Sequence, residues 1–284
     1  VGGGFANIVT QLAHYSSIGG GRWNLANEAY AVVGGGILNT ASGRFSSVAG
    51  GYNNIASTYS ACIAGGVSNV ASEMYGSVGG GKENAAAGYA ATISGGVDNT
   101  ATTSASYSFV GGGLQNVANG SYAIVIGGNS NAGSGEGSVV VGGVLNTASA
   151  DSAVVGGGSY NVALNKYGTI SGGRENTARG YATAISGGFS NSAGGYTAAI
   201  GGGFANAVTE LAHYSSIGGG RWNLANEAYA VVGGGTLNTA SGRFSSVAGG
   251  YNNIASTYSA CVAGGINNVA SQSYGSVVGG KENT

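Results

Sequence analysis

Small and apolar residues recur along the whole chain in a short, regular pattern. Each unit starts with Val or Ile, continues with one small residue and two glycines, and has Asn at its seventh position, as in Val33 to Asn39. The commonest spacing between unit starts is fifteen residues. This period is too short for helical hairpin repeats, and no apolar residues follow helical spacing over three turns. The pattern therefore predicts a chain without helices.

The pattern divides the chain into nineteen units, of which the last is incomplete. Both glycines and the Asn occur in all nineteen units. The ninth position is Ala in fifteen of the eighteen complete units, and the exceptions are Val9, Gly133 and Val208. We infer that the ninth residue points into a narrow interior that admits only a small side chain.

Each unit is expected to form one coil with two short strands and two turns. The run Ala31 to Val33 is rich in β-branched residues, and Asn39 to Ala41 forms a second short strand. The glycine pair supplies positive φ and close backbone approach at the first corner. Coils stacked at about 4.8 Å would form a rod of roughly 90 Å. We predict an all-β parallel β-solenoid, or β-roll, of about nineteen coils with a fifteen-residue period.

Insertions and a long duplication define the domain organisation. Three units have seventeen residues, including those around His14 and His213, and the extra residues are expected in loops because a stacked strand cannot absorb them. Residues 200–284 repeat residues 1–85 with eleven substitutions. We expect residues 1–284 to form a single β-solenoid repeat array. Since the array shows no capping units, we also expect it to be a fragment of a longer protein.

The recurring asparagines are predicted to form a structural ladder. Identical inward amides one coil apart can donate and accept hydrogen bonds along the stack, which satisfies polar groups inside a narrow core. We assign these residues to packing and not to ligand binding. The candidate ladder residues are Asn24, Asn39, Asn54, Asn69, Asn84, Asn99, Asn116, Asn146, Asn161, Asn176, Asn238 and Asn253.

A second column is aromatic and falls three or four residues before the next unit start in sixteen of the eighteen complete coils. Ring stacking and burial are expected to stabilise the second corner. The one-residue variation in position leaves a tyrosine stripe for binding as the alternative. Representative residues of the aromatic column are Tyr30, Tyr59, Tyr75, Tyr122 and Tyr229.

The strand before each glycine pair carries information about assembly. In the strand Ala31 to Val33, Ala31 and Val33 are expected to point to one side and Val32 to the other, and the outward position is uncharged in every coil. A strand that is apolar on both faces implies a neighbouring layer, which a thin coil cannot supply itself. We predict self-association of parallel chains into a homo-oligomer, most simply a trimer.

The pattern Ser46 to Gly51 followed by Asn54 to Ser57 resembles the head repeats of YadA-like trimeric autotransporter adhesins. Thr40 to Gly43 and Thr239 to Gly242 match a second element of that repeat, and the likeness covers the whole chain. The resemblance implies a left-handed parallel β-roll in which three chains pack around a common axis. It also implies an adhesive surface displayed outside the cell.

Composition and charge exclude several other classes of protein. The 284 residues include 60 glycines and no proline, yet 43% are hydrophobic, which favours folding over disorder. Nine basic and ten acidic residues nearly cancel, so the chain lacks the excess positive charge that would favour binding to nucleic acid or to an anionic membrane surface. The chain also has no apolar run long enough to span a membrane, so no membrane contact is expected within this segment.

One motif superficially matches a phosphate-binding loop. Gly76 to Lys82 and Gly275 to Lys281 both read G-x-x-x-x-G-K, but Glu83 and Glu282 stand where Ser or Thr is required. The repeat already explains these glycines, and no helix follows them. We therefore predict no nucleotide site.

No metal, cofactor or catalytic residue is predicted. The only aspartates, Asp98 and Asp151, lie in different settings and do not form calcium-binding turns. His14 and His213 occupy equivalent positions thirteen coils apart, so they cannot share one metal. The ten acidic residues are scattered over the coils and supply no catalytic cluster.

The two cysteines, Cys62 and Cys261, are expected to be free. They would lie roughly 60 Å apart along the stack, which is far beyond the reach of a disulfide. In a parallel oligomer the thiols of one level could approach each other, so pairing between chains stays open.

These features together predict a non-enzymatic extracellular structural or adhesive fibre segment at the cell surface, either a surface adhesin or a filament. A phage-type tail fibre or another receptor-binding rod is the alternative. Beyond further copies of the chain, the expected partners are a host surface, an extracellular matrix or neighbouring filaments.

Overall fold

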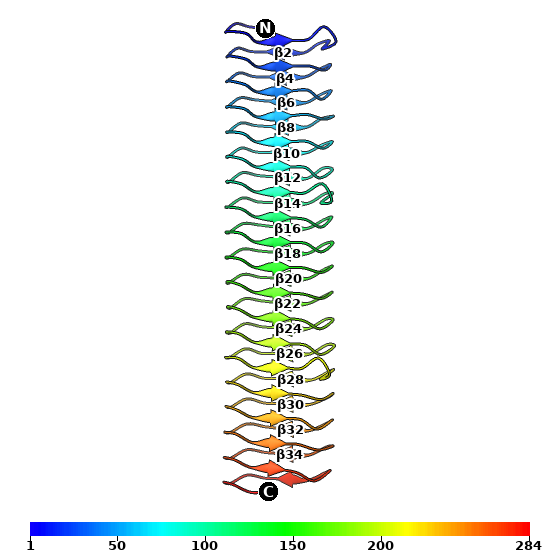
Figure 1. Cartoon of the computed structure of the whole chain (residues 1–284), viewed down its shortest axis with the longest axis vertical. Coiled ribbons are helices and arrows are strands. Elements are labelled where there is room, and N and C mark those ends of the chain that lie inside the picture. Colours follow the sequence, from blue (N-terminus) through cyan, green and yellow to red (C-terminus); the bar gives the residue numbers. More distant parts are fainter. The chain divides into compact units, whose positions relative to one another are not determined.

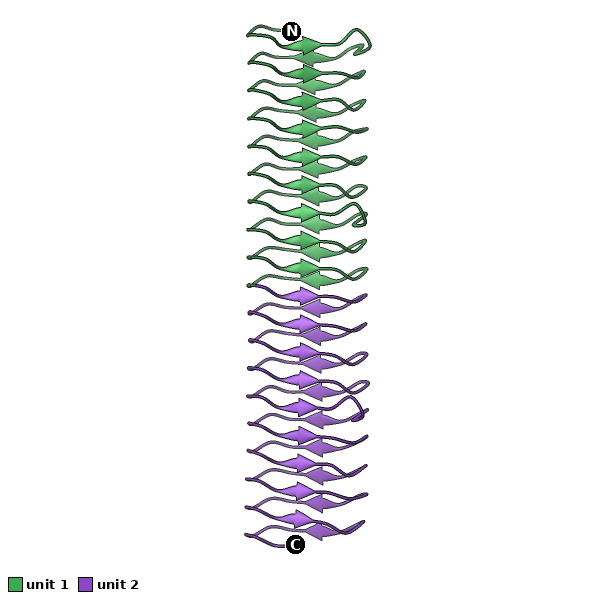
Figure 2. Ribbon diagram, viewed as in Figure 1, with its two compact units in different colours: residues 1–144 green, residues 145–284 purple.

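The computed structural model describes residues 1–284 and divides them into two compact units, Val1–Val144 and Leu145–Thr284 (Figure 2). Each unit contains eighteen strands of two residues, arranged in nine turns, and no helix. The predicted all-β parallel solenoid with a fifteen-residue period is therefore confirmed in each unit. The left-handedness, the trimer and the single array over residues 1–284 stay predictions.

Unit 1 contains two sheets, one of odd-numbered and one of even-numbered strands (Figure 1). The odd strands are β1 (Ile8–Val9), β3 (Leu25–Ala26), β5 (Thr40–Ala41), β7 (Ile55–Ala56), β9 (Val70–Ala71), β11 (Ala85–Ala86), β13 (Thr100–Ala101), β15 (Val117–Ala118) and β17 (Ala132–Gly133). The even strands are β2 (Ser17–Ile18), β4 (Val32–Val33), β6 (Ser47–Val48), β8 (Cys62–Ile63), β10 (Ser77–Val78), β12 (Thr92–Ile93), β14 (Phe109–Val110), β16 (Ile124–Val125) and β18 (Val139–Val140).

Unit 2 repeats this arrangement. Its odd strands are β19 (Thr147–Ala148), β21 (Val162–Ala163), β23 (Thr177–Ala178), β25 (Ser192–Ala193), β27 (Ala207–Val208), β29 (Leu224–Ala225), β31 (Thr239–Ala240), β33 (Ile254–Ala255) and β35 (Val269–Ala270). Its even strands are β20 (Val154–Val155), β22 (Thr169–Ile170), β24 (Ala184–Ile185), β26 (Ala199–Ile200), β28 (Ser216–Ile217), β30 (Val231–Val232), β32 (Ser246–Val247), β34 (Cys261–Val262) and β36 (Ser276–Val277).

Neighbouring strands of a sheet are parallel and pair in register. Ser47 pairs with Cys62 fifteen residues later, whereas Ile8 pairs with Leu25 seventeen residues later. The strands on both sides of the seventeen-residue coil pair with the equivalent strands of the next coil, so the two extra residues extend the second corner as a loop. This agrees with the position expected for the insertions.

The core of each turn is thin and is built from three inward columns. The second residue of every even strand from β4 to β34 is a Val or Ile that is almost fully buried, as Val33 is. Ala41 of the facing odd strand and Ala31 before β4 are also fully buried, whereas Val32 is 40% exposed. Since side chains alternate along a strand, only one face of each two-residue strand contributes to the core.

The first glycine of the pair has a positive φ in some coils, such as +158° at Gly65, but only the second glycine is crowded by atoms of the neighbouring coil. Gly96 has a φ of +93°, and a Cβ there would overlap the carbonyl oxygen of Gly113 and come within 2.5 Å of Asn99 Nδ2. Gly95 does not have a positive φ, and the nearest atom to its Cβ position is 3.9 Å away. The corner therefore requires glycine at the position where adjacent coils approach most closely.

Two further positions in most coils adopt the left-handed conformation without glycine, which the sequence analysis did not predict. Leu38, before the ladder Asn, has a φ of 60°, and Tyr30, at the second corner, has a φ of 62°. The Leu38 N–H donates to the Arg22 carbonyl (3.0 Å) and the Tyr30 N–H donates to the His14 carbonyl (2.9 Å). Contacts between coils thus outweigh a backbone cost of about 1–3 kcal/mol per residue.

Candidate functional site

The ladder asparagines are held inside the first corner by hydrogen bonds to two neighbouring coils. Asn84 Nδ2 donates to Asn69 Oδ1 (3.1 Å), to the Gly80 carbonyl (3.0 Å) and to the Gly96 carbonyl (2.9 Å). Asn84 Oδ1 accepts from the backbone N–H of Asn99 and from Asn99 Nδ2, both at 3.0 Å. One amide therefore joins three consecutive coils.

The other ladder asparagines repeat the bond to the glycine carbonyl of the next coil, and they are at most 1% exposed. Within unit 1 these are Asn24, Asn39, Asn54, Asn69, Asn99 and Asn116. Within unit 2 they are Asn146, Asn161, Asn176, Asn238 and Asn253. Since their amides are buried and bonded, these side chains offer no atoms to a ligand.

In each unit, the aromatic column forms a continuous ladder of eight rings, one from the second corner of each of eight successive coils. Neighbouring ring centroids lie 4.8 to 5.7 Å apart. The ladder of unit 1 is Tyr15, Tyr30, Phe45, Tyr59, Tyr75, Tyr89, Tyr107 and Tyr122. The ladder of unit 2 is Tyr167, Tyr181, Tyr196, Tyr214, Tyr229, Phe244, Tyr258 and Tyr274.

The angle between neighbouring rings follows the backbone position of each ring. Tyr30 and Phe45 both occupy the left-handed position, and their planes differ by 14°. Tyr59 lies one residue earlier, because Ser60 takes the left-handed position, and its ring meets Phe45 at 76°. Equal positions give stacked rings and unequal positions give edge-to-face rings throughout both ladders. The one-residue variation seen in the sequence therefore decides the ring geometry.

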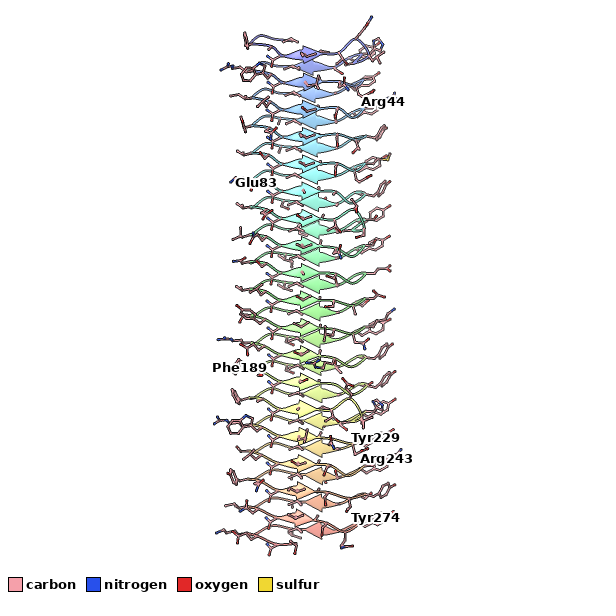
Figure 3. All side chains as sticks on the ribbon, in the orientation of Figure 1. Arg44, Glu83, Phe189, Tyr229, Arg243 and Tyr274 are labelled. Carbon is pink, nitrogen blue, oxygen red and sulfur yellow. The ribbon has the colours of Figure 1, made fainter.

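The ladder rings contact each other and also remain exposed to solvent. Their exposed fractions range from 37% for Tyr59 to 82% for Tyr15. Arg44 lies over Phe45 in unit 1 at 5.0 Å, and Arg243 lies over Phe244 in unit 2 at 5.1 Å (Figure 3). Each ladder thus exposes ring edges to solvent, and at least one of its rings has an arginine guanidinium within cation–π distance.

The crowding of phenols in the ladder gives a pH-dependent prediction at Tyr89. Burial raises the pKa of the Tyr89 phenol above its ordinary value of 10.0, and Tyr107 and Tyr75 beside it raise the pKa further. The protonated phenol is therefore favoured in the fold, so this contribution to stability is complete below pH 10.0 and is lost as the pH rises above that value.

Subtracting the alkaline titration of the Tyr89→Phe variant from that of the wild type isolates this phenol. We expect the difference in phenolate absorbance to appear above pH 10.0. Phenylalanine keeps the ring in place, so the variant removes the Tyr89 phenol and its interactions with Tyr75 and Tyr107 without opening the ladder. A difference that titrates at or below pH 10.0 would contradict the predicted interaction.

A second, shorter aromatic cluster lies at the first corner of unit 2. Phe189 and Phe204 have ring centroids 5.2 Å apart, and Phe204 meets Trp222 edge to face at 5.8 Å. The Arg221 guanidinium lies 3.9 Å from the Trp222 ring centroid. In Figure 3, Phe189 projects from the edge of unit 2 opposite Tyr229. The structure brings these outward residues together because their coils are adjacent.

The remaining candidate groups do not converge. No group of three His, Cys, Asp or Glu side chains is placed to hold a metal ion. Cys62 and Cys261 are free thiols, each within 3.3 Å of a serine hydroxyl of the preceding coil. His213 Nδ1 accepts from the Tyr196 N–H (3.0 Å). In the phosphate-loop lookalike, Lys82 forms an ion pair with Glu83 at 3.3 Å.

No helix of the structure has the length and hydropathy that a membrane crossing requires. Similarity to known proteins assigns no family to this chain. No family model matches it, and no curated protein matches it.

Proposed function

We propose that this chain is a non-enzymatic extracellular structural or adhesive fibre segment that assembles side by side with parallel copies of itself, most simply as a trimer. The proposal rests mainly on where charge is placed. All nineteen charged side chains lie outside the strands, so the outward strand residues are uncharged in both sheets of each unit. Arg179, just after β23, is the charged side chain that reaches an outward strand residue, Ser192 of β25. A large uncharged sheet face favours burial against another layer.

The apolar residues on the even-strand face of unit 1 support this interpretation. Ile124 of β16 is 37% exposed, and Ile126 just after it is 50% exposed. Val141, one coil further along, is 45% exposed. Phe109 and Val139 lie on the same sheet in register with Ile124. These five residues form a contiguous apolar patch on the even-strand face, which Thr92 borders on the N-terminal side.

A charge placed in this patch is expected to prevent assembly. We predict that the Ile124→Lys variant is monomeric by sedimentation velocity under conditions where the wild type associates, because assembly would bury an unpaired ammonium group. The matched control is Asn129→Lys, which adds the same charge to the first corner of the same coil, where Arg22 and Lys82 occur naturally. The control should associate like the wild type. A monomeric wild type would refute side-by-side assembly.

The cellular role is tested separately by immunogold electron microscopy of the native source. Label on filaments or tips outside the cell is expected. Label confined to the cell interior would refute the extracellular role whatever the oligomeric state of the purified chain.

A further inference from the structure

The aromatic ladders hold most of the tyrosines of the chain in contact with another tyrosine. Phe45 and Phe244 have no hydroxyl and interrupt the series of phenols. Between these breaks each unit keeps five consecutive tyrosines. They are Tyr59, Tyr75, Tyr89, Tyr107 and Tyr122 in unit 1, and Tyr167, Tyr181, Tyr196, Tyr214 and Tyr229 in unit 2.

Within these runs, three pairs have nearly parallel rings. Their centroid distances and interplanar angles are 5.3 Å and 6° for Tyr107 with Tyr122, 5.0 Å and 4° for Tyr181 with Tyr196, and 5.2 Å and 15° for Tyr214 with Tyr229. The two rings of each pair occupy the same position in successive coils. Their equivalent ring carbons, including those next to the hydroxyl, are therefore neighbours.

The backbone fixes these pairs while leaving the rings accessible. The Tyr122 N–H donates to the Ser106 carbonyl of the preceding coil (2.8 Å), one residue before Tyr107. Tyr107 and Tyr122 are 52% and 54% exposed. Surface side chains of this kind change rotamer on a timescale of nanoseconds or less, which lets the ring edges meet.

We propose that the aromatic ladder is a site of oxidative tyrosine coupling, which joins neighbouring coils through a covalent bond between phenol rings. The co-substrate is a peroxide activated by a haem peroxidase. Each phenol of a pair loses one electron and one proton, and one hydrogen peroxide is reduced to two waters. The two tyrosyl radicals form a carbon–carbon bond between their ortho carbons. The hydrogen on each of these carbons then moves to the phenol oxygen, which restores both aromatic rings.

Three tyrosines outside the ladder serve as internal controls. Tyr52, Tyr160 and Tyr251 are 47%, 50% and 48% exposed, so an oxidant reaches them as readily as the ladder. Tyr52 lies between Ile37 and Val67 of the adjacent coils, and Tyr251 lies between Thr236 and Ile266. Tyr160 occupies the left-handed position that Leu145 and Glu175 occupy in the adjacent coils. None of the three controls therefore has a tyrosine at the equivalent position of a neighbouring coil.

The test treats a dilute solution of the 284-residue chain with a haem peroxidase and limiting hydrogen peroxide. We expect dityrosine fluorescence, a monomer on denaturing gels, and the loss of two hydrogens per link by mass spectrometry. Peptide mapping should find links between Tyr107 and Tyr122, Tyr181 and Tyr196, and Tyr214 and Tyr229, several-fold more often than links to Tyr52, Tyr160 or Tyr251. The denatured chain should lose this preference.

Two conservative variants sharpen the test. Tyr122→Phe keeps the stacked ring but removes the phenol, so it should abolish the link between Tyr107 and Tyr122 and leave the pairs of unit 2 unchanged. Tyr160→Phe should leave the whole pattern unchanged. Links spread evenly over all exposed tyrosines would overturn the proposal, as would links that form only between chains in proportion to protein concentration. Neither outcome depends on whether the chain is a surface fibre.

Discussion

Replacing Asn84 with alanine is expected to lower the free energy of unfolding by about 3–5 kcal/mol. The substitution removes all five hydrogen bonds of the Asn84 side chain, each worth about 0.5–1.5 kcal/mol net. The buried N–H of Asn99 also loses its acceptor, and the alanine leaves a small cavity beneath the corner. Urea unfolding followed by far-ultraviolet circular dichroism would measure the change.

Asn27→Ala is the matched control for this prediction. Asn27 is exposed, and no hydrogen bond of its side chain contributes to the stack. Its replacement should change the stability by no more than about 0.5 kcal/mol. Equal losses in the two variants would show that the amide ladder does not stabilise the fold beyond the general effect of removing an asparagine.

Replacing Gly96 with alanine is expected to destabilise unit 1 by about 2–6 kcal/mol, from backbone strain and overpacking together. The φ of +93° disfavours any residue with a Cβ. The new methyl group would also lie 2.5 Å from Asn99 Nδ2 and 2.7 Å from the Gly113 nitrogen. These atoms belong to the hydrogen-bonded lattice and cannot withdraw without breaking it.

Gly95→Ala tests whether this cost is specific to the second glycine. Both residues belong to the same corner, but a methyl group at Gly95 would have no atom within 3.9 Å. We expect a loss of less than about 1 kcal/mol, measured by the same unfolding experiment. Similar losses at the two positions would contradict the steric explanation of the corner.

The effects of Asn84 and Gly96 should not add, because the two residues share one network. Asn84 Nδ2 donates to the Gly96 carbonyl at 2.9 Å, so either substitution disturbs the same contact between coils. A double variant is therefore expected to lose less stability than the sum of the single variants. Corner residues thus stabilise the stack, while the uncharged sheet faces remain available for association.

The sequence by itself determined the period, the strands and the inward residues of this protein. Asn39 and Asn54 recur at fifteen residues because the Asn39 amide oxygen accepts from both the backbone and the side chain of Asn54 one coil further along. The small residue at the ninth position, such as Ala41, predicted the narrow interior that the structure shows. Repetition made these features visible, since each residue type appears once per coil at the position where it is needed.

Only the tertiary structure decided which backbone positions are strained and how a one-residue shift of a ring changes the angle at which it meets its neighbours. The left-handed conformation of Leu38 and Tyr30 depends on hydrogen bonds to the preceding coil, and local propensity disfavours it. The edge-to-face contact of Phe45 with Tyr59 and the cluster around Trp222 likewise join residues from different coils. Such contacts depend on the positions that the stacked coils give to these side chains, which the repeat period alone does not fix.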